Sequence, residues 1–270
     1  MSGDGGDELD DAVLRKQVND TGFPLQLAVE HEVRTTSAQW KIVARELYWS
    51  QNSRSGYADL VIFRDPIFFV IECKRRSAGH WAFLTDKELL RSSLRAVVAD
   101  REGLFISDYG TFDPSTPQAD FCAVAGAKND DRRSLERIAS ELVVATEAIA
   151  GMHAERAKVT QGLEPCVFIP MIVTVPTPAF ISVSPEMISI EDGTIPSGAS
   201  FEPARFVRFR KPLAQLGDEI PISAASLEDI AENTERTVMV VHAPHLASFL
   251  DGLWSVKREN MYSLTRRGRS

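Results

Sequence analysis

The apolar positions near the start of the chain follow a helical period. Over residues 24–36 they recur four positions apart, which predicts an amphipathic helix. Its apolar face consists of Leu25, Val29 and Val33. A shorter helix is predicted over residues 9–18, and the polar break at residues 20–22 follows it. The chain therefore begins with two helices joined by a turn.

Three strand-like segments follow these helices. Residues 41–49 are rich in strand-forming side chains, and the polar residues 51–56 form a predicted link after them. The apolar runs 57–63 and 68–74 lie on either side of a turn that Pro66 marks. These two runs predict a β-hairpin with a loop of about four residues.

The middle of the chain predicts two more helices. Residues 85–99 carry apolar side chains at helical spacing. These are Leu89, Leu90, Leu94 and Val97. A stronger amphipathic pattern covers residues 132–151, and Gly151 is expected to end it. Its apolar stripe consists of Leu135, Ile138, Leu142, Val143 and Ile149. Between the two helices, residues 120–128 predict a strand.

A nearly all-apolar run at residues 167–175 has the pattern of a strand buried on both faces. Pro170 counts against a fully paired central position, because proline has no N–H to donate. Two further strands are predicted at residues 206–210 and 237–242. Together these elements predict one compact α/β domain with an elaborated C-terminal part.

The composition fits such a domain and narrows the function. Of the 270 residues, 44% are hydrophobic and 25% are charged, which is typical of a soluble globular protein. The three cysteines are far apart, which fits a reducing compartment and argues against a cysteine-rich zinc site. We expect a cytoplasmic protein without a membrane span, because the sequence has no long apolar stretch and no signal-peptide pattern. The net charge of -8 argues against a protein that coats nucleic acid non-specifically, although it permits a local basic cleft.

The predicted hairpin brings two carboxylates together. If Phe63 faces Phe68 across the turn, the register places Asp59 opposite Glu72, with Cβ atoms about 5 Å apart. Because side chains alternate along a strand, Lys74 returns to the same face as Glu72. The spacing therefore predicts two carboxylates and an ammonium on one patch of the hairpin.

Such a patch favours a hydrolytic site. Two like charges directly opposite each other destabilise a hairpin unless something compensates them. Mg²⁺ is a natural compensator, because it binds one or two carboxylates and otherwise keeps its water. The alternative is a solvated hairpin face with a cross-strand ion pair. The strongly apolar residues on both faces of the hairpin argue against that alternative.

The hairpin resembles the core of the PD-(D/E)xK nuclease superfamily, which includes restriction endonucleases. The resemblance lies in residues 57–76, YADLVIFRDPIFFVIECKRR. In that superfamily one strand carries an Asp, and an apolar strand after a hairpin carries Glu-x-Lys. Asp59 and the segment Glu72-Cys73-Lys74 match this motif, while Ala58 stands where the superfamily usually has proline.

The resemblance implies a restriction-endonuclease-like core, in which helices flank a central mixed β-sheet. The order of helix, three strands, helix and strand matches if residues 132–151 form the second core helix. Residues 77–128 are then an insertion, and the alternative takes residues 85–99 as the second core helix. The implied organisation is a flexible acidic lead with a short helix (residues 1–20), the nuclease-like core (21–176) and a C-terminal extension with a basic tail packed on that core (177–270).

The resemblance also implies a metal site. Asp59, Glu72 and the backbone carbonyl of Cys73 would hold Mg²⁺, for which Mn²⁺ can substitute. Many relatives add a carboxylate from the first helix, and Glu30 is the candidate for it here. In relatives with a similar helix start, that carboxylate would fall nearer Gln26, so both positions stay open.

The implied function is a metal-dependent nuclease acting on nucleic acid, with DNA expected ahead of RNA, in a defence or repair system. Lys74 would orient the attacking water or neutralise charge on the phosphate. Arg64, Arg75 and Arg76 would contact the nucleic acid. A homodimer or a partner subunit fits this function. The alternative is a catalytically retired nuclease-like fold that binds nucleic acid or protein.

Overall fold

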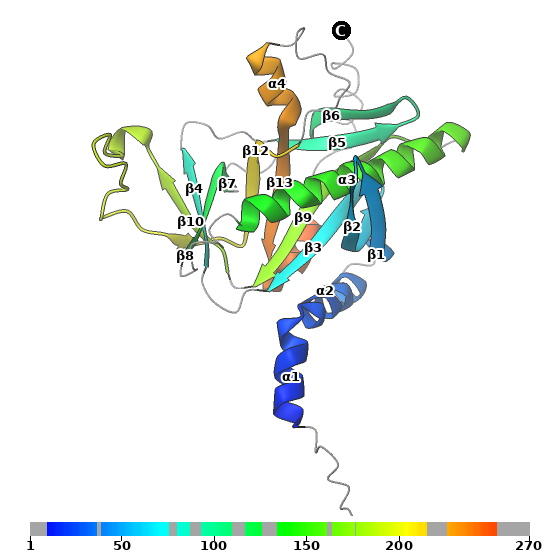
Figure 1. Ribbon diagram of the computed structural model, residues 1–270, viewed down its shortest axis with the longest axis horizontal. Helices are drawn as coiled ribbons and strands as arrows, with labels where there is room; N and C mark the ends of the chain where they lie inside the picture. The colour runs from blue at the N-terminus through cyan, green and yellow to red at the C-terminus, as the bar shows by residue number, and fades with distance from the viewer. Residues whose placement is uncertain are drawn as a thin grey trace, which may run out of the picture.

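The computed structural model is an α/β protein in which helices flank a central mixed β-sheet, as the elements predicted (Figure 1). It describes residues 10–36, 39–75, 80–86, 93–109, 117–125, 134–160, 164–175, 177–214 and 226–252. Within these ranges no helix is long and apolar enough to cross a membrane.

The helices and strands have the following bounds. The helices are α1 (Asp11–Asp20), α2 (Phe23–Thr36), α3 (Ser134–Val159), α4 (Leu227–Thr234) and α5 (Leu246–Gly252), with short 3-10 turns at Pro185–Met187 and Ala243–His245. The strands up to α3 are β1 (Lys41–Gln51), β2 (Arg54–Arg64), β3 (Ile67–Arg75), β4 (His80–Asp86), β5 (Leu94–Asp100), β6 (Gly103–Tyr109), β7 (Gln118–Ala119) and β8 (Phe121–Ala125). The strands after α3 are β9 (Cys166–Val175), β10 (Ala179–Val183), β11 (Glu202–Pro203), β12 (Phe206–Pro212) and β13 (Glu235–His242).

In the described part of the chain, the main sheet runs in the order β1-β2-β3-β9-β13-β12-β7, and β5 joins it beside β9 and pairs with β6. The first three strands form an antiparallel meander, whereas β9 is parallel to both β3 and β13. A second, smaller sheet has the order β11-β10-β4-β8 and lies at the left of Figure 1. The sheet is therefore mixed, and its meander forms one edge.

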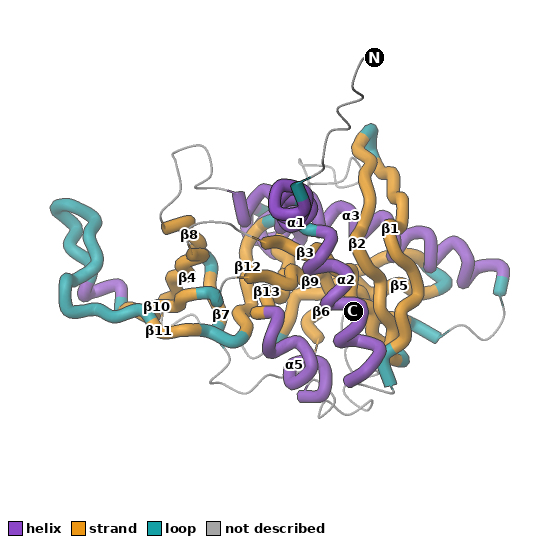
Figure 2. Tube along the Cα trace, turned by 90° about the horizontal axis from the view of Figure 1, so that it is seen from below, coloured by secondary structure: helices purple, strands orange, loops and turns teal. Residues whose placement is uncertain are grey.

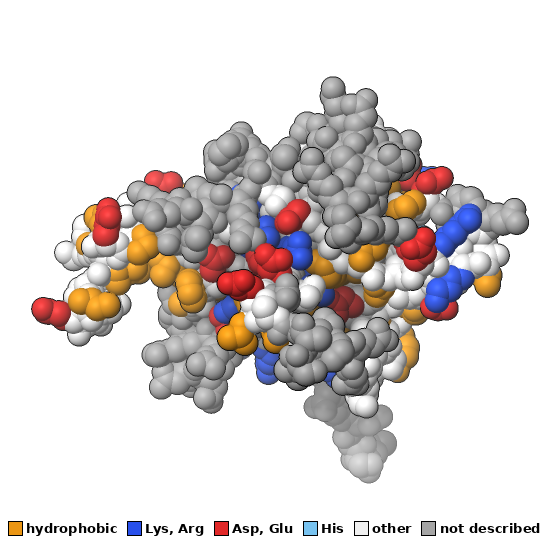
Figure 3. Space-filling model, turned by 90° about the horizontal axis from the view of Figure 1, so that it is seen from above, with side chains coloured by type: hydrophobic (Ala, Val, Ile, Leu, Met, Phe, Trp, Pro, Cys, Tyr) orange, Lys and Arg blue, Asp and Glu red, His pale blue; other side chains and the backbone are white. Residues whose placement is uncertain are grey.

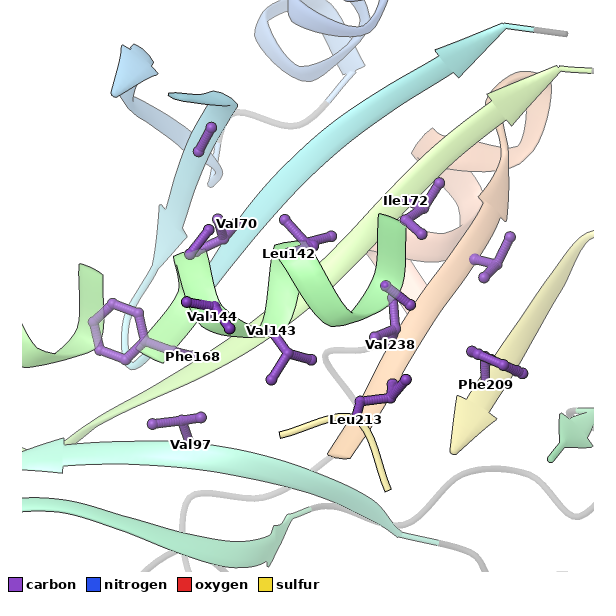
Figure 4. Close-up of a cluster of buried hydrophobic side chains, with 14 of the residues drawn as sticks. Val70, Val97, Leu142, Val143, Val144, Phe168, Ile172, Phe209, Leu213 and Val238 are labelled. Atoms are coloured by element: carbon purple, nitrogen blue, oxygen red, sulfur yellow. The ribbon is translucent and has the colours of Figure 1, made fainter. Parts of the chain in front are cut away.

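Helices cover both faces of the main sheet (Figures 1 and 2). On one face α3 lies across the strands, and its Leu142 belongs to one buried cluster with Val70 of β3 and Ile172 of β9 (Figure 4). On the other face α2 and α5 contribute Val29 and Phe249 to a second cluster. The core therefore consists of two apolar layers separated by the sheet.

Both N-terminal helices occur where the apolar pattern predicts them. The second, α2, begins at Phe23 and buries Val29 and Val33, as expected. Gly22 joins it to α1 with a φ of +83°, a conformation that favours glycine. No side chain of α1 is buried, and the helix projects from the body (Figure 1).

The long amphipathic helix continues past its predicted end. Helix α3 ends at Val159 and not at Gly151. Glycine in a helix interior is less favourable than alanine by about 1 kcal/mol. However, Ala150, Ala154 and Ala157 are buried around and after this position. Their packing offsets the low helix propensity of the glycine.

The helix predicted over residues 85–99 is wrong, and so is the alternative that used it as the second core helix. The described parts of this segment lie in β4 and β5, while Leu89 and Leu90 lie outside the described residues. Strand β5 contains the adjacent β-branched residues Val97 and Val98 and pairs with both β6 and β9. Val97 belongs to the buried cluster that contains Leu142 and Val98 to the cluster that contains Val29, so the strand is buried on both faces and its apolar run fits such a strand as well as a helix.

The apolar strand predicted at residues 167–175 is confirmed as β9, which is central and buried on both faces. Pro170 lies within it, opposite Val70 of β3. On the side away from β3, β5 pairs with residues 166–168 and β13 with residues 171–174. No described strand pairs with Pro170 on that side.

The direction of the backbone explains why this proline is tolerated. The N–H of Val167 donates to the carbonyl of Pro66 (3.0 Å), on the β3 side of the strand. Successive N–H groups alternate in direction, so the nitrogen of Pro170 points to the other side. It therefore faces the gap between β5 and β13, where the missing N–H breaks no ladder hydrogen bond.

The later strands are part of the main sheet. Strands β12 and β13 confirm the strands predicted at residues 206–210 and 237–242, and they continue the sheet beyond β9 instead of packing on it as an extension. Strand β8 confirms the strand predicted within residues 120–128, of which 126–128 lie outside the described residues. The predicted insertion, residues 77–128, thus contributes strands to both sheets.

Candidate active site

The meander β1-β2-β3 builds the candidate site, and its first turn is tight. Asn52 and Ser53 join β1 to β2 with φ values of 47° and 62°. Positive φ at both central residues is the geometry of a two-residue hairpin turn. The link predicted at residues 51–56 is therefore shorter than expected, because Arg54 already pairs with Gln51.

The second turn is also shorter than predicted. Arg64 pairs with Ile67, so Asp65 and Pro66 alone connect β2 to β3, joined by a cis peptide bond. The loop of about four residues is thus reduced to two. A tight connection holds the two strands in a fixed register over the full length of their pairing.

The predicted register of this hairpin is confirmed. Phe63 pairs with Phe68, and their ring centroids are 4.3 Å apart. The pairing ends one position before Asp59 and Glu72. There, the Asp59 carboxylate accepts a hydrogen bond of 2.7 Å from the backbone N–H of Cys73. The side chain of Asp59 thus takes the place of a backbone acceptor, which fixes its position between the two strands.

The electrostatic environment of Asp59 disfavours its charged form. The pKa of Asp59 is raised to about 6, first by burial and then by the negative charge of Glu72. The hydrogen bond from Cys73 and the charge of Lys74 oppose this shift in pKa, and the charge of Glu46 adds to it. A cation bound beside Asp59 would relieve this repulsion.

Lys74 supplies positive charge to the site. Its ammonium forms an ion pair with the carboxylate of Glu72, and 36% of its side chain is exposed. Burial lowers the pKa of Lys74, but Glu72 and Asp59 raise it, and the result lies above the ordinary value. Lys74 is therefore protonated at neutral pH, which suits charge neutralisation and not proton abstraction.

A third carboxylate, Glu46, was not predicted from the sequence. In β1 it lies opposite Asp59, because the pairs on either side of it are in register. Its φ of 46° is uncommon for a residue with a side chain. The Gln26 amide of α2 donates to Glu46 Oε1 (2.6 Å) and to the carbonyl of Asp59 (3.1 Å). We call Glu46, Asp59 and Glu72 the carboxylate cluster.

The carboxylate expected from the first helix lies elsewhere. Glu30 is buried and forms ion pairs with Arg34 (2.6 Å) and with Arg45. Of the two positions left open, Gln26 is the one that contacts the cluster. Through Gln26, α2 holds Glu46 in place without supplying a carboxylate of its own.

The predicted arginines are not gathered at the site. Arg64 is buried at the turn end of the hairpin, about 17 Å along the strand from Asp59 at about 3.3 Å per residue. Arg75 follows Lys74 and donates to the carbonyl of Asn19 (2.5 Å). Arg76 lies outside the described residues.

A pocket of about 550 Å³ opens beside the carboxylate cluster. Glu72 and Lys74 line it together with Tyr57 and other residues of the β1–β2 hairpin. Its opposite wall is formed by α3, through Ile138, Glu141, Leu142 and Ala145. The pocket therefore gives a small molecule or a chain segment access to two of the three matched motif residues.

The metal-binding capacity of the site is limited. Among the described residues, no group of three or more His, Cys, Asp or Glu side chains is arranged to hold a metal ion together. Asp59 and Glu72 interact electrostatically and offer hard oxygen donors. One or two carboxylates are the usual protein contribution to a Mg²⁺ site, because this ion keeps several waters.

Comparison of the chain with models of protein families, with curated proteins and with solved structures finds no match. The resemblance to the PD-(D/E)xK superfamily therefore rests on the hairpin residues themselves.

Proposed function

We propose that this protein is a metal-dependent nuclease of the PD-(D/E)xK kind that hydrolyses phosphodiester bonds, with DNA as the first substrate to test. The observation that carries the proposal is the position of Asp59. Its carboxylate is fixed on the Cys73 N–H beside Glu72, in a setting that raises its pKa. A site with this unrelieved repulsion fits a divalent cation, and a restriction-endonuclease-like core is the fold that goes with it.

The residues of the site have distinct roles in this proposal. Asp59 and Glu72 would hold Mg²⁺ or Mn²⁺, with the carbonyl of Cys73 as a third donor. The metal would supply a water of lowered pKa and polarise the phosphate. Lys74, charged and bound to Glu72, neutralises the negative charge that develops on the phosphoryl oxygens. Glu46, held by Gln26, increases the attraction of the site for cations.

Cleavage assays with a matched pair of lysine variants test the proposal. Supercoiled plasmid and single-stranded DNA are incubated with the protein in Mg²⁺, in Mn²⁺ and in EDTA. We expect cleavage that needs the metal and that falls by about 10²- to 10³-fold in Lys74→Ala, as when one electrostatic donor is removed from a transition state. The control is Lys211→Ala, because Lys211 is also partly buried and paired with a glutamate, Glu136 (2.7 Å), outside the site. Equal activity of both variants would exclude the assigned role of Lys74.

A catalytically retired fold is the second candidate, and Gln26 is the observation that favours it. An amide stands where relatives with a similar helix start carry a carboxylate, which weakens metal binding. Titration calorimetry with Mg²⁺ and Mn²⁺ separates the two candidates. Binding that disappears in Glu72→Ala counts against the retired fold, and no binding by the intact chain favours it.

A further inference from the structure

Three parallel strands of the main sheet end side by side next to the candidate site. Strands β3, β9 and β13 run in the same direction, so their carboxyl ends lie at one edge of the sheet (Figure 1). Near these ends, Thr174 of β9 pairs with Lys74 of β3 on one side and with His242 of β13 on the other. We call these three residues the terminal row. Ligands of open α/β sheets bind at the carboxyl ends of such strands, so the row extends the candidate site across the sheet.

The terminal row points to one face of the sheet. The residues two positions before Thr174 and His242 belong to the buried cluster that α3 covers. Because alternate residues of a strand share a face, Thr174 and His242 point to the face that α3 covers. Lys74 does the same, since it lines the pocket whose opposite wall is α3. Neighbouring strands are about 4.8 Å apart, which places the Cα atoms of Lys74 and His242 about 10 Å apart.

The backbone of the terminal row is held by hydrogen bonds. Thr174 is buried, and its hydroxyl donates to the carbonyl of Lys74 (3.0 Å). The N–H of His242 donates to the carbonyl of Arg205 (2.9 Å). Lys74 and His242 are therefore fixed relative to each other, and little ordering of the backbone is needed when a ligand binds to both.

The ring of His242 is partly exposed and has polar neighbours. The Thr177 hydroxyl lies 3.4 Å from its Nδ1 and 3.3 Å from its Nε2, and the ring of His245 lies 5.5 Å away. Burial and then the charge of His245 hold the pKa of His242 below its ordinary value. The imidazole is therefore mostly neutral at neutral pH and carries one N–H donor. A phosphate oxygen can accept this N–H, and the Thr177 hydroxyl is a second donor beside it.

The charge of the whole chain makes such local contacts necessary. The net charge is -8, and acidic and basic side chains are interspersed on the described part of the face in Figure 3. Nucleic acid held by general attraction would need an excess of Lys and Arg. Hydrogen bonds to single phosphates, as Lys74 and His242 can form on either side of Thr174, do not need that excess.

We propose that His242 and Thr177 bind a phosphate of the substrate close to the one that is cut, so that the substrate strand lies across the ends of β3, β9 and β13. The inference rests on the proposed function, because it takes nucleic acid as the ligand, and it gives the direction in which the strand leaves the metal site. The distance of about 10 Å from Lys74 to His242 equals the rise of about three nucleotides in one strand of B-DNA. The bound phosphate therefore lies within about three nucleotides of the cleaved bond.

Fluorescence anisotropy with labelled oligonucleotides, in EDTA and in Ca²⁺, measures this binding separately from cleavage. The probes are single-stranded DNA, its RNA counterpart and the DNA duplex, because all three carry backbone phosphates. His242→Ala should weaken binding of the tightest probe by about 10- to 150-fold, the range for one hydrogen bond to a charged group. His242→Gln keeps an N–H donor and should bind nearly as well as the intact protein. The control is His31→Ala, because His31 is exposed on α2, outside the terminal row.

A variant with increased affinity separates a phosphate contact from a structural role. His242→Arg places a permanent cation at the end of β13. It should bind the probes more tightly than the intact protein. The slope of the logarithm of the binding constant against log salt should steepen by about 0.7 for a single strand or about 0.9 for the duplex. Thermal unfolding of every variant accompanies these titrations, and weaker binding by His242→Ala at an unchanged unfolding temperature supports the inference.

The outcomes distinguish this inference from the nuclease function. Binding that falls in His242→Ala and rises in His242→Arg, without cleavage in any metal, supports the inference and overturns the nuclease. Metal-dependent cleavage with full binding by His242→Ala overturns the inference and keeps the nuclease. Equal loss of binding in the Ala, Gln and Arg variants, together with a lower unfolding temperature, would mean that His242 is structural and overturns the inference. Absence of binding to all three probes also overturns it.

Discussion

Two regions of the molecule hold buried or partly buried charges and neutralise them differently. Where β12 and β13 approach α3, buried arginines face carboxylates, and we call this region the arginine cluster. Arg210 forms an ion pair with Glu235, and Arg236 pairs with Glu147 (2.7 Å). Each of these guanidinium groups has its own carboxylate, so burial is compensated by pairing.

The carboxylate cluster of the β1-β2-β3 meander is arranged differently. The charges that act on Asp59 are those of Glu72, Glu46 and a single ammonium, Lys74. The cluster therefore has more negative than positive charge, and after burial this charge of Glu72 and Glu46 raises the pKa of Asp59 further. The ion pairs of the arginine cluster stabilise the fold. In the carboxylate cluster, by contrast, like charges repel one another, and a bound cation can relieve that repulsion.

Removing one carboxylate from each region should change the free energy of unfolding by very different amounts. Glu147→Ala leaves Arg236 buried without its partner and should lower the free energy of unfolding by about 3 to 5 kcal/mol. Glu72→Ala removes a like charge next to Asp59 and should lower the free energy of unfolding by far less. Urea unfolding in EDTA measures both variants.

The control for this comparison is an exposed pair. Glu155 contacts Lys158 (2.5 Å) on the surface of α3, and both side chains are largely exposed. Glu155→Ala should change the free energy of unfolding by no more than about 1 kcal/mol. If Glu72→Ala destabilised the protein as much as Glu147→Ala, the carboxylate cluster would be a structural network like the arginine cluster.

The pH dependence of stability should show the unfavourable setting of the Asp59 carboxylate, which burial and then the charge of Glu72 create. Its folded pKa of about 6 lies above the ordinary value of 3.8, so the folded state binds this proton more tightly than the unfolded state. The stability from this group is fully present below pH 3.8 and is lost as pH rises through 6, by at most about 3 kcal/mol. Asp59→Asn lacks this loss, so the variant should become more stable than the intact protein as pH rises from 4 to 7.

Urea unfolding at several pH values in EDTA measures this difference between Asp59→Asn and the intact chain. Taking the difference removes the contribution of the other titrating groups. If the difference in the free energy of unfolding stayed constant between pH 4 and pH 7, the pKa of Asp59 would not be raised in the folded protein. Its repulsion could then not be the reason for a cation site.

Periodicity predicted the elements that follow one clear period. Helix α2, with Val29 and Val33, was predicted correctly because its apolar residues recur at helical spacing. The register of Phe63 with Phe68 was predicted correctly because it depends on two strands that are neighbours in the sequence. The helix predicted for the segment that contains Val97 and Val98 was wrong, because a strand buried on both faces has no polar face to reveal its period. Its identity depends in part on a partner that is distant in the sequence, β9.

The candidate site was predicted in part for the same reason. Asp59, Glu72 and Lys74 lie in one hairpin whose register follows from the sequence. Glu46 was missed because its position opposite Asp59 depends on the tight turn at Asn52, which was predicted to be longer. Glu30 was preferred over Gln26 because helical spacing does not show which turn of a helix contacts a strand packed against it.

Substitutions of Gln26 should change the carboxylate cluster by the smallest amounts. Gln26→Leu removes the hydrogen bonds to Glu46 and to the carbonyl of Asp59, and it should lower the free energy of unfolding by about 1 to 2 kcal/mol. Gln26→Glu adds another negative charge beside Glu46. It should lower the stability of the metal-free protein and raise its affinity for Mg²⁺, because each carboxylate adds both repulsion and attraction for a cation. Urea unfolding in EDTA and calorimetric titration with Mg²⁺ measure the two quantities. If stability and affinity fell together in Gln26→Glu, Gln26 would serve only to pack α2 against β1, and the surplus of negative charge would not be what draws a metal to this hairpin.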